Sequence, residues 1–576
     1  EAEALAALRL DFLDALGSAD EEMLVADFVE HVGEDLVEGD FGGSLSGAGA
    51  ILGGHGVPVD AADFGIEVFV ADDLPGAVED AGVHLGTGLG PERSGGQKQE
   101  EQQSHASHQD IWTCGRVRRL VSLRIAMSWG YLEDAGGLTG HAERIMVPKD
   151  EGELRAIVEE AQRTRTPLTI AGGGSGLTGG KVPQGGWLVS MEKFRRLEVG
   201  EGKATVGAGV TLHDLHAAAK AAGQFYPPDP TETMAFLGGT IACNSSGSRS
   251  FKYGATRQWV ERLRVVLMDG RVLDVRRGEA IDFEVPEIPQ PKAKKHSAGY
   301  PLKPGMDWVD LFVGSEGTLG LVVEAEVRLL PTPAGLLNGI VFFPDDESCF
   351  EALEAWRTVP ELRMLEYVDH PSLEMIGTKY PDIPKEARGA LIVEQIVKGD
   401  DEVDEWVDRL EAQRGLAERS WFGTTDGDRE RFRKFRHALP ETVLAISERN
   451  GFMKLGTDFS VTNEHNREMI AYYRERMDRI MPGEYCIYGH VGDSHAHVNM
   501  MPSTQERFDG GAAVMLDFAK KAVEFGGSVA AEHGLGKRKS KFLAIQYTAE
   551  QIEAMKAVKR RLDPEWLLGQ GNLFPQ

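Results

Sequence analysis

Cysteine is scarce in this chain of 576 residues. The four cysteines lie far apart, with no CxxC pair, which argues against a disulfide framework, a cysteine zinc site and an iron–sulfur cluster. Long apolar runs are also missing: no stretch approaches the roughly 18 consecutive apolar residues of a membrane-spanning helix. The first residues lack the basic and apolar segments of a secretory signal. We therefore expect a cytoplasmic protein without a membrane span.

Positive charge is in short supply as well. The chain has 62 Lys and Arg against 91 Asp and Glu, which gives a formal net charge of -29. This balance repels phosphate backbones, so no nucleic-acid partner is expected. Hydrophobic residues make up 41% of the chain and charged residues 27%. That composition is typical of a globular protein, and the length indicates two or more domains.

The shortage of positive charge is strongest at the start of the chain. Residues 1–100 hold 22 Asp or Glu, and their only basic residues are Arg9, Arg93 and Lys98. A polar tract follows at 95–110, GGQKQEEQQSHASHQD, which has too little apolar surface to offset the entropy of ordering. We expect residues 1–125 to be an acidic, Gly-rich, poorly ordered extension that activity does not need. The alternative is an acidic tail that binds a partner.

A regular succession of strands, turns and helices begins near residue 129. A helix is expected over 148–161, followed by the strand PLTIA, a glycine-rich loop and the strand WLVSM. The pattern continues to Pro331 and then restarts with strand, helix and strand segments. The sequence thus predicts an α+β protein with one domain over 126–335 and a second over 336–576, the latter with an antiparallel sheet.

Three glycine-rich loops stand out in the first domain. The loop at 171–181, AGGGSGLTGGK, follows an apolar strand and can direct several backbone amides at one anion. It contains a GxGxxG spacing, but Pro183 prevents the helix that a Rossmann site needs, and it lacks the Walker pattern. Segments 227–247 and 313–320 combine glycines and small polar residues in the same way. Together they predict a phosphate-binding surface without a Rossmann helix.

Histidines gather in the second domain. In YGHVGDSHAHVNMM (488–501), the run HAHVN predicts a strand on which His495, His497 and Asn499 share one face, and VGDS predicts a turn back from His490. His490 and His497 can then converge. With Glu532 of SVAAEHGLGK (528–537), they form a ligand set suited to zinc, manganese or iron with one position left open. No HExxH motif of a zinc protease is present.

The order of motifs is more specific than any one of them. AGGGSGLTGG, PPDP, GGTIACNSSG, KYGATRQWV and LFVGSEGTLGLV together resemble the FAD-binding domain of the vanillyl-alcohol oxidase superfamily, in its D-lactate, glycolate and D-2-hydroxyglutarate dehydrogenase branch. The resemblance covers residues 140–575. It implies a two-part FAD-binding domain of the vanillyl-alcohol oxidase type, followed by a C-terminal α+β cap domain with an antiparallel sheet.

The resemblance also implies where FAD binds. In that family the first loop binds the pyrophosphate through its backbone amides, which here belong to Gly172, Gly173, Gly174, Ser175, Gly176 and Leu177. The other implied cofactor residues are Asp229, Thr231, Gly239, Thr240, Asn244, Gly247, Gly254, Glu316, Gly317 and Gly320. Ala171 departs from the family, which often has arginine there. No histidine lies within 171–181, so the FAD is expected to be non-covalent.

The same resemblance implies roles for the histidine cluster. GHVGDSHAH is similar to the family's GHxGDGNxH motif and AEHGLG to its EHG motif. The implied metal ligands are His490, His497 and Glu532, and His533 is the implied general base. Ser494 and His495 replace the family's Gly and Asn, so His495 is either an additional ligand or part of the pocket lining.

Two cations are candidates for holding a substrate carboxylate. RFRKFRHALPE (431–441) resembles the family's arginine-bearing helix, which implies Arg436, with Arg433 as the fallback. Lys454 precedes an aspartate strand, as in the family. A solvated surface charge is the alternative for each. Pro440 stands where relatives have a hydroxyl, which weakens the case for a second substrate carboxylate. The candidate catalytic set is His533, Arg436, Lys454 and Asn499.

The function implied is the FAD-dependent, metal-assisted oxidation of a D-2-hydroxy acid to the 2-oxo acid. D-lactate, glycolate and D-2-hydroxyglutarate are the candidate substrates. A quinone, a cytochrome or an electron-transfer flavoprotein would accept the electrons, and a homodimer is one possible assembly. Two alternatives stay open: an FAD transferase like alkyl-dihydroxyacetone-phosphate synthase, whose consecutive-histidine motif is missing here, and a non-catalytic flavin-binding electron-transfer subunit.

Overall fold

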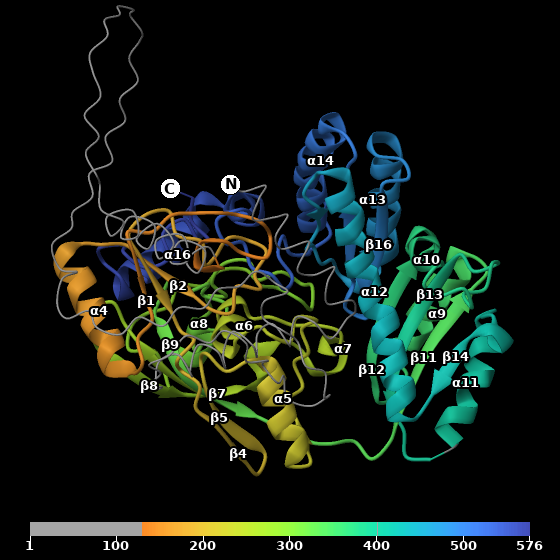
Figure 1. Ribbon diagram of the computed structural model, residues 1–576, viewed down its shortest axis with the longest axis horizontal. Helices are drawn as coiled ribbons and strands as arrows, with labels where there is room; N and C mark the ends of the chain where they lie inside the picture. Colours follow the sequence, from red (N-terminus) through yellow and green to blue (C-terminus); the bar gives the residue numbers. More distant parts are fainter. Residues whose placement is uncertain (1–129, 400, 576) are drawn as a thin grey trace, which may run out of the picture. The chain divides into compact units, whose positions relative to one another are not determined.

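A small parallel sheet begins the first domain. The computed structural model describes residues 130–399 and 401–575 (Figure 1). Strands β1 (Arg144–Met146), β3 (Trp187–Ser190) and β2 (Leu168–Ala171) form a three-stranded parallel sheet in that order. Helix α4 (Glu151–Thr164) confirms the expected helix; Asp150 caps its first turn by accepting from the Glu153 amide. The first glycine-rich loop follows β2, as predicted.

An antiparallel sheet forms the other half of the first domain. Its strand order is β4-β5-β9-β7-β8, with β4 (Leu197–Gly200), β5 (Lys203–Gly207), β7 (Val260–Val266), β8 (Val272–Arg276) and β9 (Leu321–Arg328). Strands β6 (Gln224–Phe225) and β10 (Leu330–Pro331) pair separately. The helices here are α5 (Leu212–Ala221), α6 (Leu237–Cys243), α7 (Ser250–Tyr253), α8 (Trp308–Phe312) and the 3-10 turn η2 (Thr256–Trp259).

The second domain is built on a seven-stranded sheet in the order β14-β11-β13-β12-β16-β17-β15. Every pairing in it is antiparallel, which confirms the predicted antiparallel sheet. The strands are β11 (Leu336–Phe343), β12 (Leu362–Asp369), β13 (Gly389–Ile396), β14 (Trp421–Gly423), β15 (Leu455–Gly456), β16 (Tyr485–His490) and β17 (His495–Met500).

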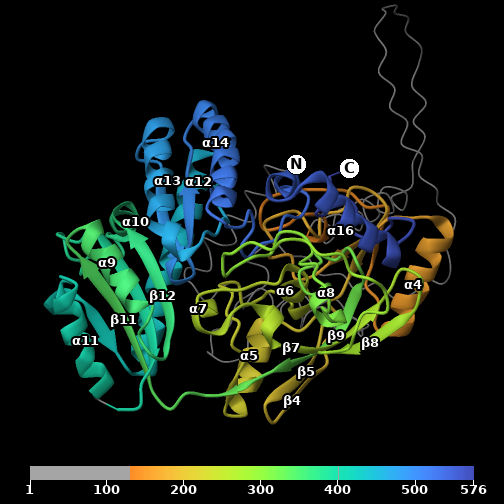
Figure 2. The same ribbon diagram turned by 180° about the vertical axis from the view of Figure 1, so that it is seen from behind.

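Helices cover both faces of this sheet. They are α9 (Asp346–Trp356), α10 (His370–Ile376), α11 (Asp401–Ala412), α12 (Asp426–Asn450), α13 (Asn466–Ile480) and α14 (Gln505–Glu524), with 3-10 turns η3 (Ala417–Arg419), η4 (Asn463–His465) and η5 (Val491–Asp493). Successive residues of β11 point to opposite faces of the sheet and pack in different cores. Val341 packs in the cluster that includes α9, and Phe342 in the one that includes α12. Figure 2 shows α9 and α10 beside the sheet.

The end of the chain returns to the first domain. It contains η6 (Ser540–Phe542), α15 (Leu543–Gln546) and α16 (Ala549–Leu562). Leu568 bridges Leu168 of β2 and packs in the same core cluster, which also contains Leu154 of α4. Lys559 donates to the carbonyls of Thr318 and Leu568. Figure 1 shows this blue segment beside the orange strands β1 and β2, so the chain's end completes the first core.

Two further expectations concern the acidic extension and membrane-spanning helices. The acidic extension, residues 1–125, lies outside the described residues. Among the described helices, none is long and apolar enough to cross a membrane.

Candidate metal and substrate site

The β16–β17 hairpin places three histidines together. β16 ends at His490, the 3-10 turn η5 reverses the chain, and β17 begins at His495. Ser494 adopts a left-handed conformation there, with φ 56°, and its hydroxyl donates to Asn463 at 2.8 Å. His490 pairs with His495 in the hairpin register. The rings of His495 and His497 lie 4.2 Å apart between centroids, so the residues predicted to share a face do so.

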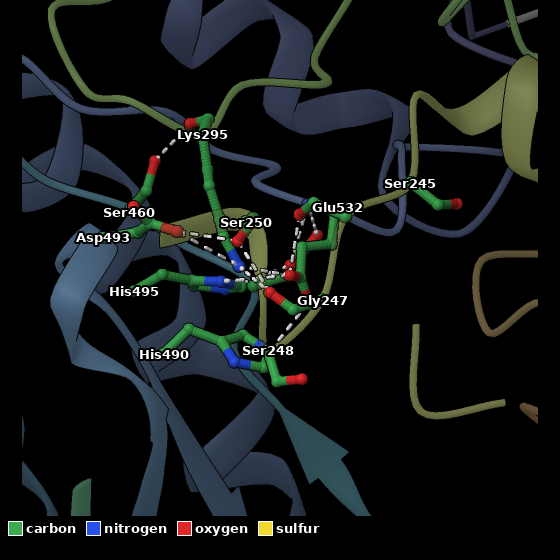
Figure 3. A network of polar contacts seen from close by, with 12 residues as sticks. Ser245, Gly247, Ser248, Ser250, Lys295, Ser460, His490, Asp493, His495 and Glu532 are labelled. Atoms are coloured by element: carbon green, nitrogen blue, oxygen red, sulfur yellow. Dashed lines mark hydrogen bonds and ion pairs between the residues drawn. The ribbon is translucent and has the colours of Figure 1, made fainter. Parts of the chain in front are cut away.

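Glu532 meets this hairpin from a loop far along the chain. Its Oε2 lies 3.4 Å from His490 Nε2 and 4.0 Å from His497 Nε2. Figure 3 shows Glu532 approaching the histidines from the side of Gly247 and Ser248. The structure therefore brings the three predicted ligands, His490, His497 and Glu532, to one buried point.

Each imidazole is held by its other nitrogen. His497 Nδ1 donates to the Thr457 carbonyl at 2.8 Å, because a carbonyl can only accept. His490 Nδ1 lies 2.5 Å from Glu366 Oε1. Such contacts put the ring proton on Nδ1 and leave the Nε2 lone pair facing Glu532. His497 Nε2, Glu532 Oε2 and, once its imidazole is neutral, His490 Nε2 are donor atoms of the kind that a divalent metal ion binds, so this set fits such an ion.

The electrostatics of the cluster agree with this arrangement. Burial alone would raise the pKa of Glu532, but His490 and Lys295 hold it well below its ordinary value. Burial and the neighbouring His495 hold the pKa of His497 far below the usual range, so this imidazole is neutral. Burial opposes ionisation of His490, but Glu532 and Glu366 outweigh it and raise its pKa. The negative potential that raises this pKa also favours a bound cation.

Arg436 contacts the cluster indirectly, through Glu366. Its Nη2 donates to Glu366 Oε1 at 3.0 Å and its Nε to Glu366 Oε2. The third nitrogen, Nη1, donates to Thr231 Oγ1 at 3.1 Å. The predicted carboxylate clamp therefore spends two nitrogens on Glu366, which in turn orients His490. Arg433, the fallback, pairs with Glu430 at 2.7 Å on the helix surface.

Asp458 organises the other side of the site. This completely buried carboxylate accepts from the backbone amide of His533 at 3.0 Å and lies 3.4 Å from His533 Nδ1. It also lies 3.2 Å from His495 Nε2. Burial would raise the pKa of Asp458, but His533 and His495 keep it far below its ordinary value. His495 thus bridges Asp458 and the ligand cluster, and both of its predicted roles stay open.

All three glycine-rich loops contact the loop that bears Glu532. Thr178 of the first loop donates to the His533 carbonyl at 3.3 Å. Ser246 of the second donates to Glu532 Oε1 at 2.8 Å. Glu316 of the third accepts from the amides of Leu535 at 2.8 Å and Gly536 at 2.6 Å. The metal cluster and the predicted flavin loops therefore form one continuous site.

The predicted cofactor residues fall into two groups. Gly176 and Gly239 are open: among the described residues, their chain neighbours and the backbone of their own helix aside, no atom lies within 4 Å of where a Cβ would stand, and Leu177 at the same loop as Gly176 is 40% exposed. Several of the others are engaged within the protein. Examples are Gly247, where a Cβ would lie 1.9 Å from the Asp229 carbonyl oxygen, and Asp229 itself, whose carboxylate lies 3.5 Å from Arg249.

Further predicted cofactor residues are also engaged. Thr240 donates to the Leu237 carbonyl at 2.9 Å, and Asn244 accepts from the Arg257 amide at 3.0 Å. A Cβ on Gly320 would lie 2.5 Å from Val265 Cγ1. Gly174 has φ 81° and Gly254 φ 74°, conformations that favour glycine. These residues shape the loops around the open positions.

Two predicted catalytic residues lie on β17 and next to β15, its neighbouring strand. Asn499 is buried on β17, and its Nδ2 donates to the His497 carbonyl at 3.3 Å. Lys454 immediately precedes β15, the partner of β17. Burial lowers the pKa of Lys454. Within 130–399 and 401–575, no ion pair involves Lys454.

Four residues of the site were not singled out from the sequence. Glu366, Asp458, Lys295 and Ser246 each contact a predicted ligand or base. Asp458 stands in the segment FMKLGTDFSV and Ser246 in GGTIACNSSG, so their motifs were noticed but their contacts were not. Lys295 and Glu366 carry no comparable signal, because an isolated charge in a strand or loop is commonplace.

Known proteins match this chain along most of its length. Residues 142–276 match the FAD binding domain family, and residues 333–573 match the C-terminal domain of FAD linked oxidases. The glycolate oxidase subunit GlcD of Bacillus subtilis is 30% identical over 75% of this chain and 89% of its own. A D-lactate dehydrogenase of Archaeoglobus fulgidus is 30% identical over 74% and 90%. A D-2-hydroxyglutarate dehydrogenase of Xanthomonas citri is 28% identical over 75% and 89%.

A solved alkyldihydroxyacetonephosphate synthase shares the fold. The TM-score is 0.54 at 16% identity, over 74% of this chain and 76% of the other. At this identity the likeness concerns the fold alone. The sequence matches extend through both domains and reach a relative of 30% identity over most of its length. The chain therefore belongs to the FAD-linked oxidases and is an oxidoreductase of the 2-hydroxyacid dehydrogenase family.

Proposed function

We propose that this protein oxidises a D-2-hydroxy acid of the D-lactate, glycolate or D-2-hydroxyglutarate type to the 2-oxo acid. The observation that carries the proposal is that His490 Nε2 and His497 Nε2 lie beside Glu532 Oε2. The loop that bears Glu532 also contacts all three glycine-rich loops. A redox site of this kind needs its metal and its flavin side by side. FAD, when bound non-covalently in those loops, accepts the hydride from the substrate.

His533 is the proposed general base. Asp458 holds its Nδ1 at 3.4 Å, which orients the ring and leaves Nε2 free to take the proton of the substrate hydroxyl. The side chain of His533 is 32% exposed, so a substrate can reach it. A divalent ion of zinc, manganese or iron, when held by His490, His497 and Glu532, lowers the pKa of that hydroxyl.

Two cations are proposed to hold the substrate carboxylate. Glu366 accepts from Nε and Nη2 of Arg436, and Thr231 accepts from Nη1. A guanidinium has five N–H groups, so one on Nη1 and one on Nη2 are left for a substrate carboxylate. Lys454 supplies the second charge, and Asn499, beside it on β17, supplies an amide. Such fixed contacts position the α-hydrogen for transfer.

The remaining features of the proposal concern the surroundings of the reaction. We expect a quinone, a cytochrome or an electron-transfer flavoprotein to reoxidise the flavin, with the protein in the cytoplasm, either alone or as a homodimer. These choices follow from the sequence and the implied chemistry.

Anaerobic titration of the FAD- and metal-loaded protein tests the proposal. D- and L-2-hydroxy acids are added separately while flavin absorbance near about 450 nm is recorded, since loss of this band reports hydride acceptance. We expect D-acids alone to bleach it, and bleaching to be lost in His533→Ala with FAD still bound. Bleaching only by an acylated dihydroxyacetone phosphate would favour the synthase alternative. No response to any acid, with normal reduction by dithionite, would favour an electron-transfer subunit.

A further inference from the structure

The two oxygens of Glu532 lie in different surroundings. Oε2 faces the histidines, 3.4 Å from His490 Nε2 and 4.0 Å from His497 Nε2. Oε1 accepts a hydrogen bond from Ser246 Oγ at 2.8 Å, pairs with the ammonium of Lys295 and lies 4.0 Å from His495 Nδ1. One oxygen is therefore directed at the metal cluster while the other is already bound.

Lys295 is fixed firmly enough to hold that oxygen. Its side chain is only 3% exposed. The ammonium also donates to the Gly247 carbonyl at 3.3 Å and lies 3.9 Å from Asp493 Oδ2, and its backbone carbonyl accepts from Ser460 Oγ at 2.7 Å. Figure 3 shows the side chain passing between Ser460 and Gly247 to reach Glu532. These oxygen partners hold the buried side chain of Lys295 in place.

We propose that Lys295 and Ser246 are positioning residues that restrict Glu532 to a single ligand oxygen. This inference rests on the proposed function, because it concerns the same metal cluster. A carboxylate can bind a divalent ion through one oxygen or through both. With Oε1 occupied from the first domain, only Oε2 is available. In the arrangement in which His495 lines the pocket and does not bind the metal, His490, His497 and Glu532 then supply one ligand atom each, the number that catalytic zinc sites use to keep a position open for substrate.

The restriction carries an electrostatic cost for metal binding. The ammonium of Lys295 repels a divalent ion held only a few ångströms away. Lys295 thus weakens metal binding and keeps one coordination position open for substrate. Loss of Lys295 strengthens metal binding and weakens substrate binding, whereas a residue that merely supported the fold would weaken both when removed. Because the two effects have opposite signs, measuring both distinguishes a positioning residue from one that only supports the fold.

The test compares Lys295→Met with wild type and with Lys292→Met as the matched control. Lys292 is exposed and lies three residues earlier on the same segment. Zinc affinity of the full-length, FAD-loaded protein is measured by competition with a chromophoric chelator. For Lys295→Met we expect the zinc dissociation constant to fall about tenfold or more, zinc X-ray absorption to gain one oxygen ligand, and KM for the 2-hydroxy acid to rise about tenfold with a smaller change in kcat. Lys292→Met should match wild type.

An unchanged or weaker zinc affinity in Lys295→Met would overturn the inference. Where that variant does not fold or retain FAD, Ser246→Ala decides. It removes one of the two partners of Oε1 without a change in charge, and it should raise KM about tenfold, the loss expected for one hydrogen bond to a charged group, with zinc affinity retained. A KM equal to wild type would then overturn the inference.

Failure of the proposed function gives a different pattern. If wild type and His490→Ala bind zinc equally poorly, the metal cluster itself is wrong. If wild type binds zinc tightly, His490→Ala does not, and Lys295→Met equals wild type, then only the positioning inference fails.

Discussion

Replacement of Glu366 by glutamine tests whether the metal site depends on a residue that does not touch the metal. Glu366 is buried on β12, with Oε1 2.5 Å from His490 Nδ1 and 3.0 Å from Arg436 Nη2. Loss of a carboxylate behind a metal-binding histidine typically costs about 10- to 100-fold in metal affinity. At about 1.4 kcal/mol per tenfold, this equals about 1.4 to 2.8 kcal/mol.

The same substitution leaves the partly buried guanidinium of Arg436 without its carboxylate partner Glu366. Breaking such a pair from one side costs about 3 to 5 kcal/mol, and we expect the lower end because glutamine keeps an acceptor oxygen for one contact. Zinc competition and urea unfolding of Glu366→Gln report the two effects separately. Glu441→Gln is the control, since Glu441 lies on the same helix as Arg436 but pairs with Lys379 at the exposed surface. A zinc affinity within about twofold of wild type would refute the orienting role assigned here.

Three further predictions address the base, the pH dependence and the flavin. Asp458→Asn should lower kcat by about 100-fold or more, because His533 loses its orienting carboxylate, with FAD and metal content unchanged; turnover close to wild type would contradict the assigned base. Burial raises the pKa of Glu316 to about 7 from 4.5, so between these values the folded state keeps a proton that the unfolded state has lost. Stability should therefore fall as pH rises through this window, by about 3 kcal/mol, and urea titrations of Glu316→Gln should lack this slope. Gly176→Ala should fold normally but retain FAD about tenfold less tightly, because the open space beside Gly176 is where the FAD pyrophosphate is proposed to lie; Gly510→Ala, also open but on α14, should retain FAD as wild type does.

Local geometry explains why the histidine pair could be predicted. His490 and His497 lie on one hairpin, and strand periodicity with a turn between them is enough to bring them together. The antiparallel sheet of the second domain could likewise be predicted from its strand–helix–strand repeats and the family resemblance. The glycine-rich loops were visible because each carries several unusual residues in a row.

Contacts between distant segments could not be predicted in this way. Glu366 contacts His490 only because β12 pairs with β16, and the sequence of neither strand predicts that pairing. Lys295 reaches Glu532 from another domain, across 237 positions of sequence. Arg436 was singled out by its motif, but the motif does not reveal that Glu366 takes two of its nitrogens. The sequence predicted the candidate ligands, whereas the residues that orient them required coordinates.

The return of the C-terminal segment has a consequence for how the protein is made. Leu567 and Leu568 complete the core around α4 and β2, yet the ribosome adds them after the entire second domain. The core cluster around α4 and β2 is therefore incomplete until these two leucines have been synthesised. A truncation before Leu567 would remove them from this first-domain cluster and leave every strand of the second-domain sheet in place.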